Sequence, residues 1–243
     1  GMDAYMGLTN YFQLEGLAYR LVPIYSEDNP NPNVLGRIAT DIMYSNVMEE
    51  FQWGNMEDTT GVYLDENIRR MTTNLRLQAG NLAETLMNEE KEDKALNVLD
   101  KIVEVTPEVN VPYDRVMLPI IENYWALGPR DTTGMNLSPD LQELKTALSP
   151  EQQEYAQEMG KELTNRLFEI FEDELEYFFS LENQFAAQYA NEMELKLSVN
   201  RRLTMLYGFY APEDEMGINL ATKLDSLTTR FEKKMMNIGR VEF

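Results

Sequence analysis

The chain contains no histidine and no cysteine among its 243 residues. This absence excludes a Ser-His-Asp triad, a Cys-His nucleophile, zinc sites and histidine-containing di-iron sites. It also removes any disulfide evidence about the cellular compartment. Chemistry in this chain would have to use carboxylate, lysine, tyrosine or hydroxyl groups, and we expect neither a metal nor a cofactor.

Basic residues and long apolar runs are also scarce. With 21 basic against 42 acidic residues, the net charge is −21, which argues against nucleic acid and anionic lipid as partners. It favours basic or neutral partners instead. No stretch approaches 18 apolar residues, so we expect no direct membrane insertion by this chain. Apolar residues make up 43%, enough for one large or two small folded domains.

The N-terminal segment is rich in aromatic and aliphatic residues and is interrupted by glycine. Thr9 is placed to cap a short helix over residues 9–15, which Gly16 would end. Residues 17–25 read as an extended segment, because the residue before a proline is disfavoured in helices. Such apolar residues predict a buried lead-in to the fold, followed by a turn-rich loop at 26–33.

Helical periodicity then dominates and predicts an all-α fold. Apolar residues recur at helical spacing over 36–52, and Asp65 is placed to cap the following helix. That helix and a partner helix ended by a proline form a hairpin across the turn at 89–93. With the proline at the last signature position of a 34-residue tetratricopeptide repeat, the packing positions are Leu82, Ala83, Leu86, Ala95, Leu99 and Pro107. An ordinary helical hairpin is the alternative, since Ala79 stands where the repeat has a large aromatic residue.

The second half of the chain predicts further helices. Residues 112–128 fill the next first-helix position, with Tyr113 at the early aromatic site and Pro119 expected to kink the helix. A loop at 129–151 carries a short helix at 139–147. Long amphipathic helices follow: one from Ser149-Pro150, one over 183–209 and one over 214–237. The predicted regions are 1–62 (N-terminal segment and first helix), 63–128 (repeat region), 129–151 (loop insert) and 152–243 (long-helix bundle), forming one continuous domain.

Few side chains are candidates for function. Glu169 and Asp173 lie one helical turn apart and could form a hydrolytic carboxylate pair, although a solvated helix face explains them better. Trp53, in a Gly-Asn loop, is a candidate platform for a sugar ring, whereas an ordinary packing role is the alternative. Further candidates for binding are Arg69, Arg76 and Tyr113. In so acidic a chain the arginines would also pair with neighbouring acids.

Four sequence blocks resemble a bacterial multi-pass membrane family that is related to protein O-mannosyltransferases. The blocks are Gly7–Pro23 (GLTNYFQLEGLAYRLVP), Met43–Asn55 (MYSNVMEEFQWGN), Tyr63–Met71 (YLDENIRRM) and Asn110–Tyr124 (NVPYDRVMLPIIENY). The similarity returns at 172–181, while the insert at 129–151 departs from the family's shorter link. The resemblance implies a parent protein whose membrane region takes sugar from a lipid-linked donor. Its catalytic carboxylates would lie outside this chain.

The resemblance further implies that this chain is a soluble C-terminal region on the extracytoplasmic (periplasmic) face. We therefore expect a non-catalytic, tetratricopeptide-like domain that docks an acceptor protein or positions the membrane region of its own parent. A glycan-binding module that uses exposed aromatics such as Trp53 is the alternative. An independent hydrolase built on the carboxylates at 169–176 is a third hypothesis.

Overall fold

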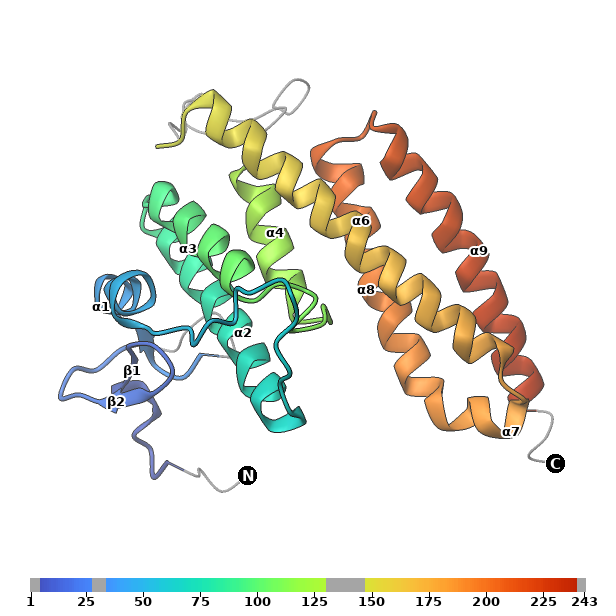
Figure 1. Cartoon of the computed structure of the whole chain (residues 1–243), viewed down its shortest axis with the longest axis horizontal. Helices are drawn as coiled ribbons and strands as arrows, with labels where there is room; N and C mark the ends of the chain where they lie inside the picture. The colour runs from blue at the N-terminus through green and yellow to red at the C-terminus, as the bar shows by residue number, and fades with distance from the viewer. Residues whose placement is uncertain (1–4, 28–33, 130–146, 240–243) are drawn as a thin grey trace. The chain divides into compact units, whose positions relative to one another are not determined.

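The computed structural model describes residues 5–27, 34–129 and 147–239, which divide into two compact units (Figure 1). The first unit comprises residues 1–112 with 143–149, and the second comprises residues 113–142 with 150–243. Within the described residues the fold is almost entirely helical and opens with a short extended segment, as predicted. No helix in that part of the chain is both long enough and apolar enough to cross a bilayer.

A small three-stranded sheet begins the first unit. After a 3-10 turn (η1, Thr9–Tyr11) come β1 (Phe12–Leu14), β2 (Tyr19–Leu21) and β3 (Arg37–Ile38), in the spatial order β2-β1-β3. β1 pairs antiparallel with β2 and parallel with β3. The predicted helix over 9–15 is therefore wrong beyond its first turn, because residues 12–14 pair with both neighbouring strands.

The close approach of β3 to β1 requires a glycine before β3. Gly36 has φ +62°, and a Cβ atom there would lie 2.1 Å from the carbonyl oxygen of Phe12. Only glycine tolerates both conditions without strain. The backbone NH of Ala39 then donates to the oxygen of Leu14 at 2.9 Å, which continues the pairing to the edge of the next helix.

The helix predicted over 36–52 is shorter in the structure. α1 runs from Thr40 to Ser45 and continues into a π-helical turn, η2 (Asn46–Glu50). The helix starts late because Arg37–Ile38 belongs to the sheet. The loop that follows is held by Asn110, whose amide Nδ2 donates to the oxygens of Met56 (2.6 Å) and Asp58 (2.8 Å) and whose Oδ1 accepts from the NH of Val62 at 2.7 Å.

A helical hairpin forms the centre of the first unit. α2 spans Glu66–Asn88 and α3 spans Glu92–Val105. The predicted cap is present, since the Asp65 carboxylate accepts from the NH of Ile68 at 2.9 Å. The predicted packing positions Leu82, Ala83, Leu86, Ala95 and Leu99 are fully buried, at 0% exposure, and Pro107 follows the end of α3. The hairpin is thus as expected, whereas its membership of the tetratricopeptide class stays a prediction.

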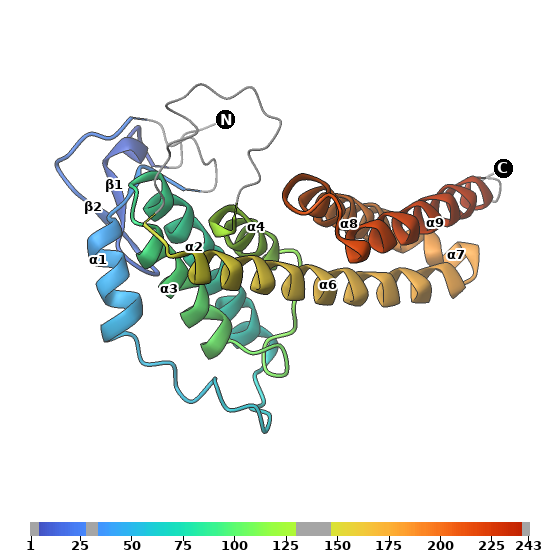
Figure 2. The ribbon, with the colours of Figure 1, turned by 90° about the horizontal axis from the view of Figure 1, so that it is seen from above.

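The second unit is built from helices that run alongside one another (Figure 2). Its elements are α4 (Met117–Leu127), α6 (Pro150–Ser180), α7 (Asn183–Ala186), a 3-10 turn η3 (Ala187–Tyr189), α8 (Ala190–Tyr210) and α9 (Glu215–Ile238). The predicted start at Pro150 agrees, but the helix predicted over 183–209 is divided at η3. The short helix predicted at 139–147 lies largely outside the described residues.

The core of the second unit gathers around Trp125, which is 0% exposed. Its indole NH donates to the hydroxyl of Thr164 at 2.9 Å, and its ring stacks on Tyr210 at a centroid distance of 5.7 Å. This packing places α4 with the long helices and not with the hairpin, so the predicted region 63–128 is divided after Pro112. Because α4 begins at Met117, Pro119 falls in its first turn, where a missing NH breaks no helical hydrogen bond and no kink is required.

Candidate functional site

A surface hollow of about 420 Å³ opens beside the turn between β1 and β2. Residues 15–20 of the hairpin line it, together with Asn46, the first residue of η2, and Phe51, which directly follows η2. The Asn46 amide donates to the oxygen of Glu15 at 2.6 Å and so fixes the turn against the π-helical segment. The hollow is therefore lined by the hairpin turn and by residues of the π-helical segment and its end.

The charges around the hollow are unevenly balanced. Arg20 pairs with Glu15 at 3.0 Å, so these two charges compensate each other. Glu49 and Glu50, which directly precede Phe51, are exposed. Among the described residues neither takes part in an ion pair. Two carboxylates without an ion pair thus lie one and two positions before Phe51, which lines the hollow.

Large apolar side chains are exposed on the segment that forms the sheet. We call them the N-terminal apolar set: Tyr5 (46% exposed), Met6 (85%), Leu17 (61%), Leu21 (55%), Ile24 (48%) and Tyr25 (64%). The expectation that this segment is buried is therefore wrong for these residues. The reason is that the sheet has only three short strands, which bury Leu14 but leave the margin at β2 uncovered.

Trp53, the predicted sugar platform, is half-buried. Its ring meets Phe51 edge-to-face at a centroid distance of 5.8 Å, and both rings line a small cavity that adjoins the hollow. Packing thus accounts for one face of the indole. Trp53 joins the candidate site through this small cavity, which shares Gly16, Leu17 and Phe51 with the hollow.

The other predicted binding residues are dispersed. Arg69 is exposed in the first turn of α2, and Tyr113 is half-buried at the beginning of the second unit. Arg76 is only 1% exposed, so the expectation that it contacts a partner is not supported by its position. The sequence feature that indicates burial of Arg76 is its spacing: it lies on the same face of α2 as the buried residues Thr72 and Ala79.

Arg76 instead closes the end of α3. Its Nε donates to the hydroxyl of Thr106 at 3.1 Å, and its Nη2 donates to the oxygens of Thr106 and Val111, each at 2.6 Å. Nη1 donates to the oxygen of Pro112 at 3.0 Å. Carbonyl groups at the end of a helix lack intrahelical donors, and this guanidinium supplies donors to those that are buried here.

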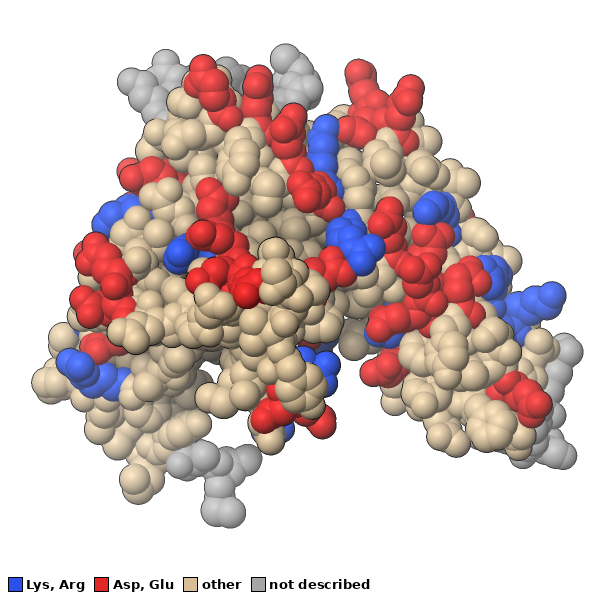
Figure 3. Space-filling view, viewed as in Figure 1, with Lys and Arg blue, Asp and Glu red and all other residues tan. Residues whose placement is uncertain are grey.

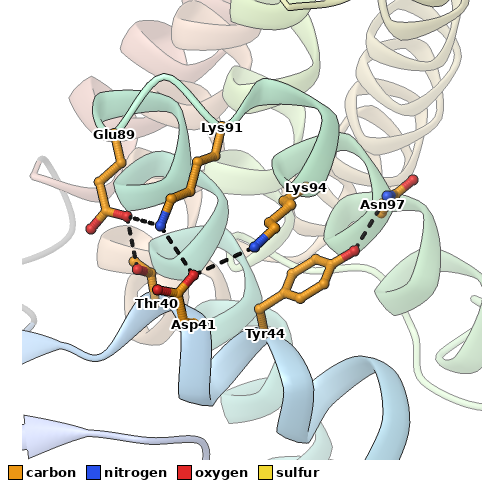
Figure 4. Close-up of polar contacts among 7 residues, drawn as sticks. All are labelled: Thr40, Asp41, Tyr44, Glu89, Lys91, Lys94 and Asn97. Atoms are coloured by element: carbon orange, nitrogen blue, oxygen red, sulfur yellow. Dashed lines mark hydrogen bonds and ion pairs between the residues drawn. The ribbon is translucent and has the colours of Figure 1, made fainter.

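A polar network attaches α1 to the turn of the hairpin (Figure 4). The Asp41 carboxylate lies 3.1 Å from Lys91 and 3.4 Å from Lys94, and the hydroxyl of Thr40 donates to Glu89 at 2.8 Å. The hydrogen bond from Lys91 and its positive charge lower the pKa of Asp41, and the hydrogen bond to Glu89 raises the pKa of Lys91. Asp41 and Glu89 are exposed, Lys91 and Lys94 are half-buried and Thr40 is buried. These side chains pair with one another, which indicates a structural role.

Three of the five carboxylates at 169–176, on α6, form ion pairs with other helices. Glu169 instead contacts Arg166 of its own helix at 3.6 Å, and Asp173 is exposed and forms no ion pair among the described residues. Glu172 contacts Lys223 at 2.7 Å, Glu174 contacts Lys196 at 2.6 Å, and Glu176 forms a bidentate pair with Arg230. The hydrogen bond from Arg230 lowers the pKa of Glu176. Figure 3 shows acidic side chains with basic ones interspersed among them on one face of the molecule. This pattern is that of interhelical pairing and gives the hydrolase hypothesis no support.

Tyr207 is a buried phenol of the second unit. Its hydroxyl donates to the Oδ1 of Asn165 at 3.0 Å, and burial raises its pKa to about 12. A phenol with that pKa remains protonated at neutral pH and cannot serve as a general base.

Further comparison adds no catalytic or family assignment. Within residues 5–27, 34–129 and 147–239, no group of three or more acidic residues is arranged to hold a metal ion. Neither protein-family models nor curated proteins nor solved structures give a match to this chain. The geometry therefore defines one candidate site, the hollow with its apolar margin.

We expect Arg76→Leu to lower the free energy of unfolding by about 3 kcal/mol, because it leaves several buried carbonyl oxygens without donors. Arg69→Leu, on the exposed part of the same helix, should change it by less than about 0.5 kcal/mol. Urea unfolding followed by circular dichroism measures both. Equal effects of the two substitutions would contradict the role assigned to Arg76.

Asp214 allows a test of one ion pair that is separate from its role as a helix cap. It lies 2.5 Å from Lys161 and also accepts from the NH of Met216 at 2.9 Å, at the start of α9. The hydrogen bond from Lys161 lowers its pKa below the ordinary value of 3.8. A lowered pKa contributes stability that is present above pH 3.8 and is lost as the pH falls through the lowered value.

Asp214→Asn keeps a good cap and removes the charge, so it should cost about 1 kcal/mol at pH 7. The difference from the original chain should vanish as the pH falls below the lowered pKa. Asp214→Ala also removes the cap and should cost about 1 kcal/mol more at every pH. Urea titrations at pH 7 and at successively lower pH check both; a deficit in Asp214→Asn that does not shrink as the pH falls below 3.8 would refute the assignment.

Proposed function

We propose that this chain is a non-catalytic helical domain that docks a protein partner through the hollow and the N-terminal apolar set. The observation that carries the proposal is the exposure of six large apolar side chains within residues 5–25. Exposed apolar surface of this kind is typical of interaction sites. The acidic character of the chain favours a neutral or basic partner.

The resemblance to the O-mannosyltransferase-related membrane family supports a more specific proposal. The parent protein would be a polytopic membrane sugar transferase, and this chain its tetratricopeptide-like domain on the extracytoplasmic (periplasmic) face. The partner would be the acceptor protein or the membrane region of the parent itself. Catalysis would then belong to the parent's membrane region and not to this chain.

A pair of substitutions tests the docking surface in cells that express the full-length parent. Leu17→Lys with Ile24→Lys places two charges in the N-terminal apolar set and should lower the sugar attached to acceptor proteins roughly tenfold, since apolar anchors dominate docking energy. Glycoprotein staining measures the change. Sequencing the reading frame upstream of Met2 first establishes whether membrane helices precede the domain.

The matched control is Met216→Lys with Met236→Lys, which are 43% and 64% exposed on α9 in the second unit. This control adds the same charge and should leave the sugar transfer unchanged. Purified domains that carry either pair should give the same circular dichroism spectrum. Equal loss of transfer with both pairs, or no loss with either, would reject the docking surface.

A glycan-binding module is the second candidate, favoured by the partly exposed ring of Trp53 beside the hollow. If it is correct, neutral oligosaccharides should quench the tryptophan fluorescence of the domain. Trp53→Phe should abolish the quenching, because the remaining Trp125 is fully buried. A flat titration over a broad set of glycans would eliminate this candidate.

A further inference from the structure

The outer edge of β2 has backbone groups that point away from the sheet. The NH of Val22 donates to the oxygen of Tyr11 at 2.9 Å, and the NH of Glu15 donates to the oxygen of Ala18 at 3.4 Å. In an antiparallel pair the direction alternates from residue to residue. Ala18, Arg20 and Val22 therefore face β1, while the NH and C=O groups of Tyr19 and Leu21 face outward.

No other strand in the described part of the chain covers this edge, since β1 is the single neighbour of β2. Within the described residues, the outward backbone groups of Tyr19 and Leu21 have no hydrogen-bond partner. Pro23, the next outward position, has no NH and ends the usable edge. An unpaired edge of this kind is a template for one further strand.

The side chains at this edge also specify the added strand. Tyr19 and Leu21 share a face with Phe12, which lies opposite Leu21 and packs on the ring of Tyr19 at 5.9 Å. Alternate side chains of a strand lie on the same face. A segment that pairs with β2 would therefore place every second side chain on this apolar face.

The hollow supplies the charge preference. It lies at the turn end of β2, where Arg20 is already compensated by Glu15. Glu49 and Glu50, which form no ion pair among the described residues, directly precede Phe51 in the chain, and Phe51 lines the hollow. A basic side chain at the corresponding end of the added strand would approach the acidic segment that precedes Phe51. The net charge of −21 acts in the same direction.

We propose that β2 binds an extended segment of a partner protein, which adds a fourth strand to the sheet and carries alternating apolar side chains with Lys or Arg over the hollow. The inference rests on the proposed docking function and gives that function its mode of recognition. The backbone provides the affinity of the added strand, and the apolar face with the two carboxylates provides its selectivity.

The probe is the synthetic peptide KVTVTVK, acetylated and amidated at its ends, titrated into the ¹⁵N-labelled chain. The amide protons of Tyr19 and Leu21 should shift and exchange more slowly with solvent, while those of Arg20 and Val22 should change little. Two analogues are methylated on the backbone nitrogens of either the valines or the threonines. One analogue should bind at least tenfold more weakly and the other like the parent peptide, because only one edge of a strand pairs with β2.

Charge is tested by Glu49→Gln with Glu50→Gln, which should weaken peptide binding about threefold or more. Glu192→Gln with Glu194→Gln makes the same change in net charge on the exposed face of α8 and should have a smaller effect. Equal binding by both methylated analogues, equal effects of the two charge pairs, or no binding of the peptide would each overturn the strand-addition proposal. Even then, the proposed docking function would stand if Leu17→Lys with Ile24→Lys lowered sugar transfer in cells. If that pair left sugar transfer unchanged, the docking function would be rejected together with strand addition.

Discussion

The organisation of the first unit depends on how the end of α3 is closed. The buried guanidinium of Arg76 donates to the carbonyl oxygens of Thr106, Val111 and Pro112. These bonds fix the course of the chain after the helix, and Asn110 lies on that course. The Asn110 side chain in turn holds the backbone of residues 56–62. One arginine inside a helix thus determines the path of two separate loops.

Local signals were sufficient to predict most of the long helices of this chain, although not all of their bounds. Asp65 and Pro150 mark the starts of α2 and α6, and each of these signals involves only neighbouring residues. The spacing of apolar residues indicates which helix faces are buried. The sheet could not be predicted in this way, because the pairing of Gln13 with Arg37 joins residues that are 24 positions apart. The helix expected over 9–15 failed for the same reason: non-local pairing outweighed a local capping signal.

The candidate site was only partly predictable. Trp53 was proposed as a binding residue from its loop position, and that stays a prediction. The exposure of Leu17 and Leu21 contradicts the general tendency of apolar residues to be buried. This exposure arises because β2 has no second neighbouring strand, and the order of strands in a sheet cannot be read from local sequence. Arg76 shows the opposite case: a charged side chain expected at the surface is buried because helix-end carbonyls satisfy its donors.

The two tryptophans fall in different units, Trp53 in the first and Trp125 in the second. Their surroundings also differ, since one indole is partly accessible and the other is enclosed by Thr164 and two tyrosines. Each unit therefore contains one tryptophan whose fluorescence reports on the unfolding of that unit. Replacing one indole at a time makes the cooperativity between the units observable, because coincident melting of the two signals means that the units fold together and separate transitions mean that they fold independently.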